Sequence, residues 1–216
     1  MEFQELINTR KSTRHFTDKE VTKDILKEIV SEAQKAPSWV NSQPWKVTIA
    51  SGESLKEVKA VYKDLNLSGT KGNPDFPVLL NELWPEYTRN NMANSNGQIY
   101  GLEGFNDAQW QLFQAPHVAF LTIPKGAPEW AIHDLGMFSQ TLMLSAQNHG
   151  VDSIIAYAFV KYPDELRRIL SIPEDEVIGV GIALGYGEEG HHLNKGNSER
   201  NPLEQVLTFK EAHCQL

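Results

Sequence analysis

Residues 132–149 constrain the fold of this chain more than any other segment, because they are apolar on nearly every side. The segment predicts a helix that stops at Gly150, a residue typical of helix C-termini. Its large apolar residues are Leu135, Met137, Phe138, Leu142, Met143 and Leu144. A helix with apolar side chains all round has to be buried all round, either in the core of its own chain or against another subunit.

Helical and strand patterns alternate around this segment. Thr22 can cap a helix that Pro37 stops, with apolar residues at helical spacing between them. The other predicted elements are strand 45–50, helix 54–65, strand 117–123, strand 152–159, a short helix from Pro163, strand 177–186, and a terminal strand or extended arm at 202–209. This order indicates one domain, residues 1–216, of mixed α/β or α+β class.

Residues 66–109 are the least regular part of the sequence, with many glycines and prolines between aromatic residues. A stretch of this length inside a compact chain is usually functional. We therefore expect it to form a lid or one wall of a pocket.

The charge balance excludes two classes of partner. The chain has 20 Lys and Arg against 28 Asp and Glu, a net charge of −8. Nucleic-acid phosphates require a basic surface and anionic membranes attract basic segments, so we expect neither partner. The N-terminus lacks a signal-peptide pattern, no apolar run is long enough to span a bilayer, and the single cysteine, Cys214, cannot form an internal disulfide. These features favour a cytoplasmic protein.

Patterns that often mark catalytic sites are absent or out of context. The stretch GVGIALGYG lacks the spacing and the following helix of a dinucleotide site, so we expect its glycines to allow close packing of a strand. His191 and His192 are adjacent and point in different directions, which indicates an exposed loop rather than a metal site. We therefore expect no metal site, and because no nucleophile elbow is present we expect no protein nucleophile.

Positive charge gathers near the N-terminus of this acidic chain, in the stretch RKSTRHF at residues 10–16. Arg10, Lys11 and Arg14 alternate there with hydroxyl side chains such as Ser12. The stretch is either a solvated loop or a grip for an anion, in which guanidinium groups and a hydroxyl close on a phosphate.

Two later segments carry hydrogen-bonding groups of the same kind: APSWVNSQPW at 36–45 and NKGNSERNPLEQVLTF at 194–209. Each segment taken singly is a loop. Together with the first stretch they offer Arg10, Ser12, Arg14, Ser38, Asn41, Gln43 and Arg200. Such a set suits an anionic, planar, heteroaromatic ligand.

These segments resemble motifs of the FMN-dependent nitroreductase family: R-x-S-x-R-x-F at residues 10–16, A-P-S-x-x-N-x-Q-P-W at 36–45, and Gly185-Tyr186 followed by R-x-P-L at 200–203. Their order and spacing match over essentially the whole chain. LWPEYTRNN, QAPHVAFL and AYAFVKYPDELRRIL resemble the nitrobenzoate-reductase-like branch. The resemblance implies an α+β fold with a central mixed sheet flanked by helices, in an intertwined homodimer with two FMN sites across its interface.

The resemblance also implies roles around the flavin. Arg10, Ser12 and Arg200 would bind the phosphate, and Arg14 would lie by the N1/C2-carbonyl edge. Residues 155–158 would follow the edge that carries N5. The other residues implied in cofactor binding are Lys11 and Ser198, the N5-edge residues Ile155, Ala156, Tyr157 and Ala158, and, from the partner chain, Pro37, Ser38, Trp39, Asn41 and Gln43. Many relatives carry Lys or Arg where this chain has Ser198.

The implied activity is that of an FMN-dependent NAD(P)H oxidoreductase with ping-pong kinetics, acting on nitroaromatics, quinones or other flat electrophiles. A specialised flavin, enone or dehalogenating reductase, a non-catalytic flavin-binding protein and an acidic interaction domain are the alternatives. Five aromatic residues could form a stacking wall for the acceptor or simply pack in the core: Trp84, Tyr87, Tyr100, Phe105 and Trp110.

Overall fold

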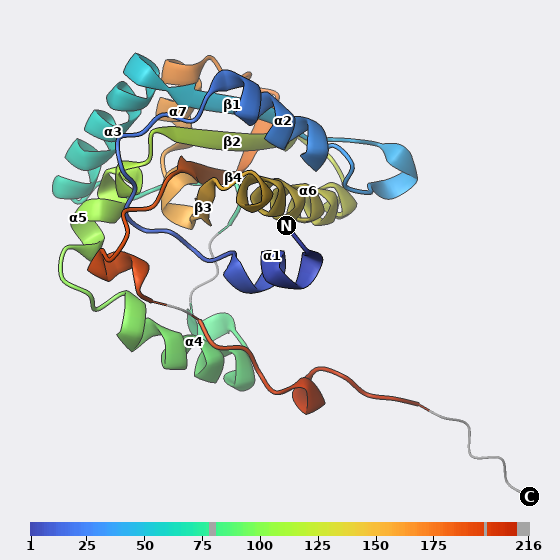
Figure 1. Ribbon diagram of the computed structural model, residues 1–216. Helices are drawn as coiled ribbons and strands as arrows, with labels where there is room; N and C mark the ends of the chain where they lie inside the picture. Colours follow the sequence, from blue (N-terminus) through green and yellow to red (C-terminus); the bar gives the residue numbers. More distant parts are fainter. Residues whose placement is uncertain (78–80, 197, 211–216) are drawn as a thin grey trace, which may run out of the picture.

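The computed structural model describes residues 1–77, 81–196 and 198–210 (Figure 1). Its strands are β1 (Lys46–Ser51), β2 (His117–Pro124), β3 (Asp152–Ile155) and β4 (Glu176–Gly185). Its α-helices are α1 (Phe3–Thr9), α2 (Lys23–Ala33), α3 (Gly52–Leu67), α4 (Glu86–Ile99), α5 (Phe105–Trp110), α6 (Glu129–Asn148) and α7 (Pro163–Leu170). The described chain is thus an α+β fold, as the sequence predicts.

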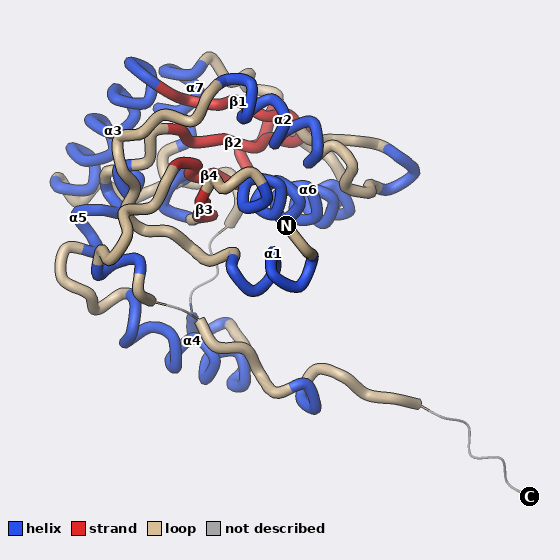
Figure 2. Tube along the Cα trace, viewed as in Figure 1, coloured by secondary structure: helices blue, strands red, loops and turns tan. Residues whose placement is uncertain are grey.

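One four-stranded sheet, in the order β1-β2-β4-β3, lies at the centre of the molecule (Figure 2). Every pair of neighbouring strands is antiparallel. Parallel pairing within the described chain is limited to an isolated bridge between Ser12 and Ser153. The sheet itself is therefore antiparallel rather than mixed, and the bridge fixes the N-terminal segment beside β3.

Helices cover both faces of the sheet, so the chain has two hydrophobic cores. Phe120 of β2 belongs to the core that includes side chains of α3, α5 and α7, whereas Leu121, its neighbour, belongs to the core with α2 and α6. Both side chains are fully buried. Burial of successive residues on opposite faces explains why this strand is continuously apolar in sequence.

Helix α6 is the helix predicted from the apolar segment, and it lies along one face of the sheet (Figure 1). Leu135, Phe138 and Leu142 on one of its sides are fully buried. On another side Ile132 is 45% exposed, and Gly136 is exposed as well. Within the single chain, therefore, only one face of α6 is buried, although the sequence predicts burial on every side. Coverage of the exposed side by a second subunit stays a prediction.

The structure differs from the sequence predictions mainly where side chains are exposed. Residues 66–109 contain α4 and most of α5, and the strand predicted at 152–159 ends at Ile155. The tail forms no strand among the residues described there; it is an extended arm with a short 3-10 helix, Leu203–Gln205, and it runs away from the body (Figure 1). No helix in the described ranges is long and apolar enough to cross a membrane.

The glycines of β4 allow close packing on both faces of the sheet. A Cβ on Gly181 would lie 2.6 Å from Cβ of Phe159, and one on Gly179 would lie 2.4 Å from Cδ2 of Leu135. Any side chain would force these neighbours apart. The prediction that these glycines serve strand packing is confirmed.

Candidate functional site

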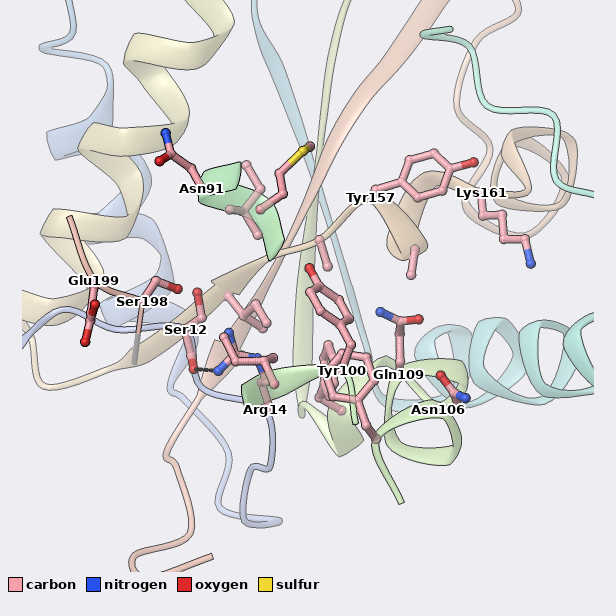
Figure 3. Close-up of a pocket in the computed structure, with 18 of the residues that line it drawn as sticks. Ser12, Arg14, Asn91, Tyr100, Asn106, Gln109, Tyr157, Lys161, Ser198 and Glu199 are labelled. Atoms are coloured by element: carbon pink, nitrogen blue, oxygen red, sulfur yellow. Dashed lines mark hydrogen bonds between the residues drawn. The ribbon is translucent and has the colours of Figure 1, made fainter. Parts of the chain in front are cut away.

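A cavity of about 1260 Å³ lies where the end of β3 meets the N-terminal segment, the start of the C-terminal arm, and helices α4 and α5 (Figure 3). Ser12, Arg14 and residues 154–158 line it together with residues 198–201. Most of the remaining wall comes from residues 91–113. The cavity exceeds the roughly 300–1,000 Å³ of a usual small-molecule site, so it has room for more than one ring system.

Arg14 reaches the cavity from the N-terminal segment, although only 8% of its surface is exposed. Its Nη1 donates to the carbonyl oxygens of Ser12 at 3.2 Å and Gly196 at 3.4 Å. Burial lowers the pKa of the guanidinium, with Tyr100 acting in the opposite direction, and the group stays protonated at neutral pH. No carboxylate in the described ranges forms an ion pair with it, so its other donors are available to a ligand.

The side chain of Asn194 holds the backbone of Arg14 in place. Its Oδ1 accepts from the N–H groups of Arg14 at 2.7 Å and His15 at 3.0 Å. Its Nδ2 donates to the carbonyl oxygens of His15 at 2.8 Å and Glu188 at 3.0 Å. Both lone pairs and both hydrogens of one buried amide are thereby used, which ties the N-terminal segment to the loop after β4.

Arg200 lines the cavity, and Arg10, which is not part of the lining, lies near enough for the two charges to interact. Burial lowers the pKa of Arg10, and the neighbouring charge of Arg200 lowers it further. Arg200 donates to carbonyl oxygens of its own segment, at 2.8 Å to Ser198 and 3.2 Å to Glu199. The Arg10 guanidinium has no hydrogen bond or ion pair with any residue that the structure describes. An anion between the two guanidinium groups would relieve their repulsion.

The other predicted residues of the N-terminal segment lie on different sides of it. Ser12 lines the cavity, and its bridge to Ser153 keeps it beside β3. Lys11 lines a separate hollow of about 510 Å³, and its Nζ donates to the carbonyl oxygen of Asn194 at 3.3 Å. The structure therefore brings Ser12 to the cavity and places the Lys11 ammonium outside it.

Residues 155–158 line the cavity where β3 gives way to a 3-10 helix, Tyr157–Val160. Ile155 is 40% exposed and Tyr157 is 50% exposed, so both residues present surface to the cavity. Burial raises the pKa of the Tyr157 phenol, which keeps it a neutral hydrogen-bond donor. Ile155, Ala156, Tyr157, Ala158, Ser198 and Arg200 all lie in the cavity wall where Ser12 and Arg14 lie.

Three of the five predicted aromatic residues line the cavity. Tyr100, Phe105 and Trp110 belong to its wall, and the ring of Tyr100 packs edge-on against Phe105 with centroids 5.1 Å apart. Trp84 and Tyr87 are partly exposed and lie outside the lining. The aromatic wall is therefore built from the two ends of α5 and the turn before it.

The loop of residues 37–43 lies away from the cavity of the same chain, beyond α2 at the far end of the molecule in Figure 1. Most of its residues are exposed. Within one chain the structure thus does not bring to the cavity the residues predicted to come from a partner: Pro37, Ser38, Trp39, Asn41 and Gln43.

This loop has an unusual backbone held by a buried carboxylate. Val40, Asn41 and Gln43 have φ angles of 46°, 58° and 45°, in a region that non-glycine residues seldom adopt. Asp134 of α6, which is 2% exposed, accepts from the N–H of Trp39 at 2.9 Å through Oδ2. Strained backbone that is stabilised in this way is concentrated at functional sites.

The loop with the two adjacent histidines is packed more closely against the rest of the chain than the sequence predicts. The ring of His191 stacks on His15 with centroids 3.7 Å apart and an angle of 6° between planes, and His15 Nε2 lies 2.9 Å from Glu188 Oε2. His192 is exposed. His15, Glu188 and His191 are close enough to share an ion. However, one ion cannot lie in two parallel, stacked ring planes, so this arrangement does not form a metal site.

Asn194 and Asp134 are site residues that the sequence patterns do not single out. Asn194 lies 180 positions from Arg14, and Asp134 lies 95 positions from Trp39. No spacing or periodicity connects residues so far apart. The dense cluster of polar residues around Asn194 is the one local signal, and it is also typical of an ordinary loop.

Comparison with known proteins places these features in a family. The model of the Nitroreductase family matches residues 7–186. The chain is 28% identical over 219 aligned positions to nitrobenzene nitroreductase of Ectopseudomonas oleovorans, covering 95% of each chain. It is 25% identical over 220 positions to 4-nitrobenzoate reductase of Pseudomonas putida, covering 96% of this chain and 94% of the relative.

Solved structures agree with the sequence comparison. The crystal structure of the FMN-dependent nitroreductase NfnB from Mycobacterium smegmatis in complex with NADPH is similar with a TM-score of 0.90 and 26% identity, over 96% of this chain and 97% of that chain. The family match extends from the N-terminal cation segment through β4, so it includes most of the cavity wall. This chain belongs to the nitroreductase family.

Proposed function

We propose that this protein is an FMN-dependent NAD(P)H oxidoreductase that reduces nitroaromatic, quinone and similar flat electrophilic acceptors. The observation that carries the proposal is the pair Arg200, in the wall of a cavity of about 1260 Å³, and Arg10, whose charge interacts with that of Arg200; neither forms an ion pair with a carboxylate among the residues that the structure describes. Guanidinium groups are well suited to phosphate, which they bind in pairs of hydrogen bonds. Relatives described as nitroreductases, and a solved structure described as FMN-dependent with bound NADPH, support the assignment.

The phosphate of FMN fits the end of the cavity where Arg200 and Ser198 lie. Ser12 offers a hydroxyl beside Ser198 (Figure 3), and Arg10 adds a second positive charge near Arg200. Charge-assisted hydrogen bonds of this kind are about twice as strong as neutral ones. A bound phosphate would also remove the repulsion that lowers the pKa of Arg10.

Arg14 would act on the electron transfer rather than on binding alone. Bound FMN supplies the redox chemistry, because it takes up a hydride from a nicotinamide and passes electrons to the acceptor. The guanidinium of Arg14, on a backbone that Asn194 fixes, would stabilise the negative charge that reduction places on the N1/C2-carbonyl edge. No side chain has to act as a nucleophile in this scheme.

The remaining cavity space suits a second flat molecule. Tyr100, Phe105 and Trp110 offer aromatic surface on which a ring can stack. We infer that NAD(P)H and the acceptor occupy this space in turn, which is the ping-pong order. Tyr157 lies at the edge of the space and would help to decide which rings can enter.

We propose that two copies of the chain form the working unit. Apolar side chains that a single chain leaves exposed occur on α1, on α6 and along the C-terminal arm: Phe3, Ile7, Ile132, Leu203, Val206 and Phe209. Burying them against a second copy follows from the hydrophobic effect. The loop of residues 37–43 would then contribute to the cavity of the partner, as the resemblance implies.

The test is the colour and the redox behaviour of the purified protein. We expect yellow protein with stoichiometric FMN that bleaches on addition of NADH or NADPH under argon and recovers its colour on addition of nitrobenzene. Bound flavin that no nicotinamide bleaches would indicate a non-catalytic flavin-binding protein. Colourless protein that fails to take up added FMN would refute the proposal. Sedimentation at micromolar concentration should show a dimer.

A further inference from the structure

The cavity contains a cation that the proposed flavin contacts leave unused. Lys161 lines the cavity next to Tyr157, and Figure 3 shows the two together on one side, with Ser198 and Glu199 on the other. Since Ser198 precedes Arg200 and marks the phosphate end, Lys161 lies at the opposite end. That end is the part of the cavity left for the acceptor.

Neutral partners hold the Lys161 side chain in place. Its Nζ donates to Oδ1 of Asn66 at 2.8 Å and lies 5.0 Å from the ring centroid of Tyr162. Its stem lies against Gly72, where an added Cβ would come within 2.3 Å of the lysine Cγ. Within the described ranges no carboxylate forms an ion pair with this ammonium. A cation that is fixed in advance and lacks a counter-ion is ready to bind an anion.

Amide side chains on the same side of the cavity offer further hydrogen-bond donors. Asn106 and Gln109 line the cavity on the same side as Lys161 in Figure 3, whereas the amide of Asn66 is already bonded to Tyr62 and Lys161. Amide N–H₂ groups and an ammonium together match the oxygen atoms of a carboxylate. The charged residues of the cavity wall also favour an anion, since three are cations and only Glu199 is acidic, in a chain of net charge −8.

We infer that Lys161 is a specificity-determining residue that selects acceptors with a carboxylate, or a similar anionic oxygen group, on the ring edge remote from the group that is reduced. The inference rests on the proposed function, which places the reducible group at the flavin. The aromatic residues Tyr100 and Trp110 would hold the ring between the flavin and the ammonium. Nitroaromatic carboxylates therefore form the substrate class that this end of the cavity fits.

A phosphate of NADPH is the other anion that could reach an ammonium in the cavity. The position of Lys161 favours the acceptor, because it adjoins residues 155–158, which are expected along the reactive edge of the flavin. If the nicotinamide of NADPH lies at that edge, a ribose separates it from the phosphates, which are therefore farther from the edge than Lys161 is. The two assignments predict changes in different half-reactions and can be separated.

The experiment compares two acceptors of the same shape, 4-nitrobenzoate and the neutral methyl 4-nitrobenzoate. Flavin-loaded protein is reduced under argon with a stoichiometric amount of NADH, and reoxidation by each acceptor is followed by stopped-flow absorbance. We expect Lys161→Met to lower the second-order rate constant for 4-nitrobenzoate by about tenfold, the loss of one charge-assisted contact. The rate constant for the ester should stay within about twofold, and Lys161→Arg should restore most of the preference for the acid.

Two further measurements make the result specific. Lys63→Met removes an exposed lysine on α3, outside the cavity wall, and should leave both rate constants unchanged. Benzoate, which cannot be reduced, should perturb the flavin absorbance on binding, and Lys161→Met should weaken that binding by about tenfold. This titration does not depend on turnover.

Equal losses for the acid and the ester would overturn the inference, because they would show that Lys161 only supports the fold. So would a selective loss in flavin reduction by NADPH and not by NADH, which would assign the ammonium to the dinucleotide. If wild-type reduced protein transferred electrons to neither of these acceptors nor to a quinone, the proposed function would fail. The benzoate titration would then still decide whether Lys161 binds carboxylates.

Discussion

The two segments that bring cations to the cavity differ in how firmly their own chain positions them. In residues 10–16, Arg14 is 8% exposed, and its backbone is fixed by Asn194. The C-terminal arm is exposed from residue 199 to residue 210, and Arg200 is bonded to carbonyl oxygens of its own segment. One half of the proposed FMN site is thus preorganised within a single chain, and the other half is not.

This difference has an energetic consequence. Contacts from the N-terminal segment would act on FMN without further ordering, because the fold has already fixed that segment. Contacts from the arm would lose part of their strength to the conformational entropy of ordering it. A second copy that covers the apolar residues of the arm would reduce this cost, which connects FMN binding to dimer formation.

The largest expected effect comes from removing the apolar contacts of the arm. Leu203 and Phe209 are 64% and 78% exposed in the single chain. If a second copy covers them, the combined Leu203→Ser and Phe209→Ser variant should weaken the dimer by about 4 kcal/mol over four side chains, about a thousandfold in dissociation constant. Sedimentation over a concentration series measures this change.

The matched control for the arm is Leu67→Ser, which alters an equally exposed leucine, 62% exposed, at the end of α3. It should leave the dissociation constant of the dimer unchanged. If the arm variant dimerised as tightly as wild type, the arm would have no part in the interface. The difference in order between the N-terminal segment and the arm would then have no connection with dimer formation.

The next largest effect should come from breaking the fixed half of the site. Asn194→Ala removes one amide that makes four hydrogen bonds, with Arg14, His15 and Glu188. We expect the free energy of unfolding to fall by about 3 kcal/mol, because buried N–H and carbonyl groups lose their partners. Urea denaturation of the flavin-free protein measures this loss.

Asn148→Ala provides the control, because Asn148 is exposed and accepts a hydrogen bond from the N-terminal ammonium at 3.0 Å. Its free energy of unfolding should change by less than about 0.5 kcal/mol. A loss below about 1 kcal/mol for Asn194→Ala would show that the N-terminal segment is no better fixed than the arm.

Comparing Arg10→Ala with Arg200→Ala tests directly whether the N-terminal segment contributes more to FMN binding than the arm does. We expect Arg10→Ala to weaken FMN binding by at least about tenfold, because a charge-assisted contact contributes about 1.5–3 kcal/mol. Arg200→Ala should weaken it by only about threefold, since ordering the arm offsets part of the contact. Quenching of FMN fluorescence measures both affinities.

Arg89→Ala alters an exposed arginine of α4 outside the cavity wall, so it should leave FMN affinity unchanged. An effect of Arg200→Ala larger than that of Arg10→Ala would reverse the comparison and show that the arm is ordered before FMN binds. Unchanged affinity for Arg10→Ala would remove Arg10 from the site.

The fold was predictable where local patterns are strong. Thr22 accepts from the N–H of Ile25 at 3.3 Å, as expected of the cap of α2, and β2 is buried along nearly its whole length, as its continuous apolar sequence indicates. Helix α1 was missed because none of its residues is buried in the single chain. Helix α4 was missed because its sequence has few apolar residues to show a helical period.

The site was predictable only as far as short motifs reach. Ser12, Arg14 and Arg200 lie in motifs that resemble those of a known family, and the structure brings all three to one cavity. Asn194 and Lys161 belong to the site through tertiary contacts: Asn194 bonds a residue 180 positions away, and Lys161 bonds one 95 positions away. Contacts over such separations leave no mark in spacing or periodicity, so only the fold reveals them.

A further small effect tests the fixed half of the site specifically, because it depends on the charge of Arg14. Its guanidinium bonds the carbonyl oxygens of Ser12 and Gly196 and makes no ion pair with Asp18, the surface carboxylate one helical turn away in sequence. If the cation stabilises reduced flavin, Arg14→Gln should lower the midpoint potential and slow flavin reduction by NAD(P)H, with less effect on FMN affinity than Arg10→Ala. A lost preference of about 1 kcal/mol corresponds to about 20 mV for a two-electron couple. Spectroelectrochemical titration of wild type and variant measures the shift, and equal potentials would mean that Arg14 contributes only to packing in the fixed half of the site.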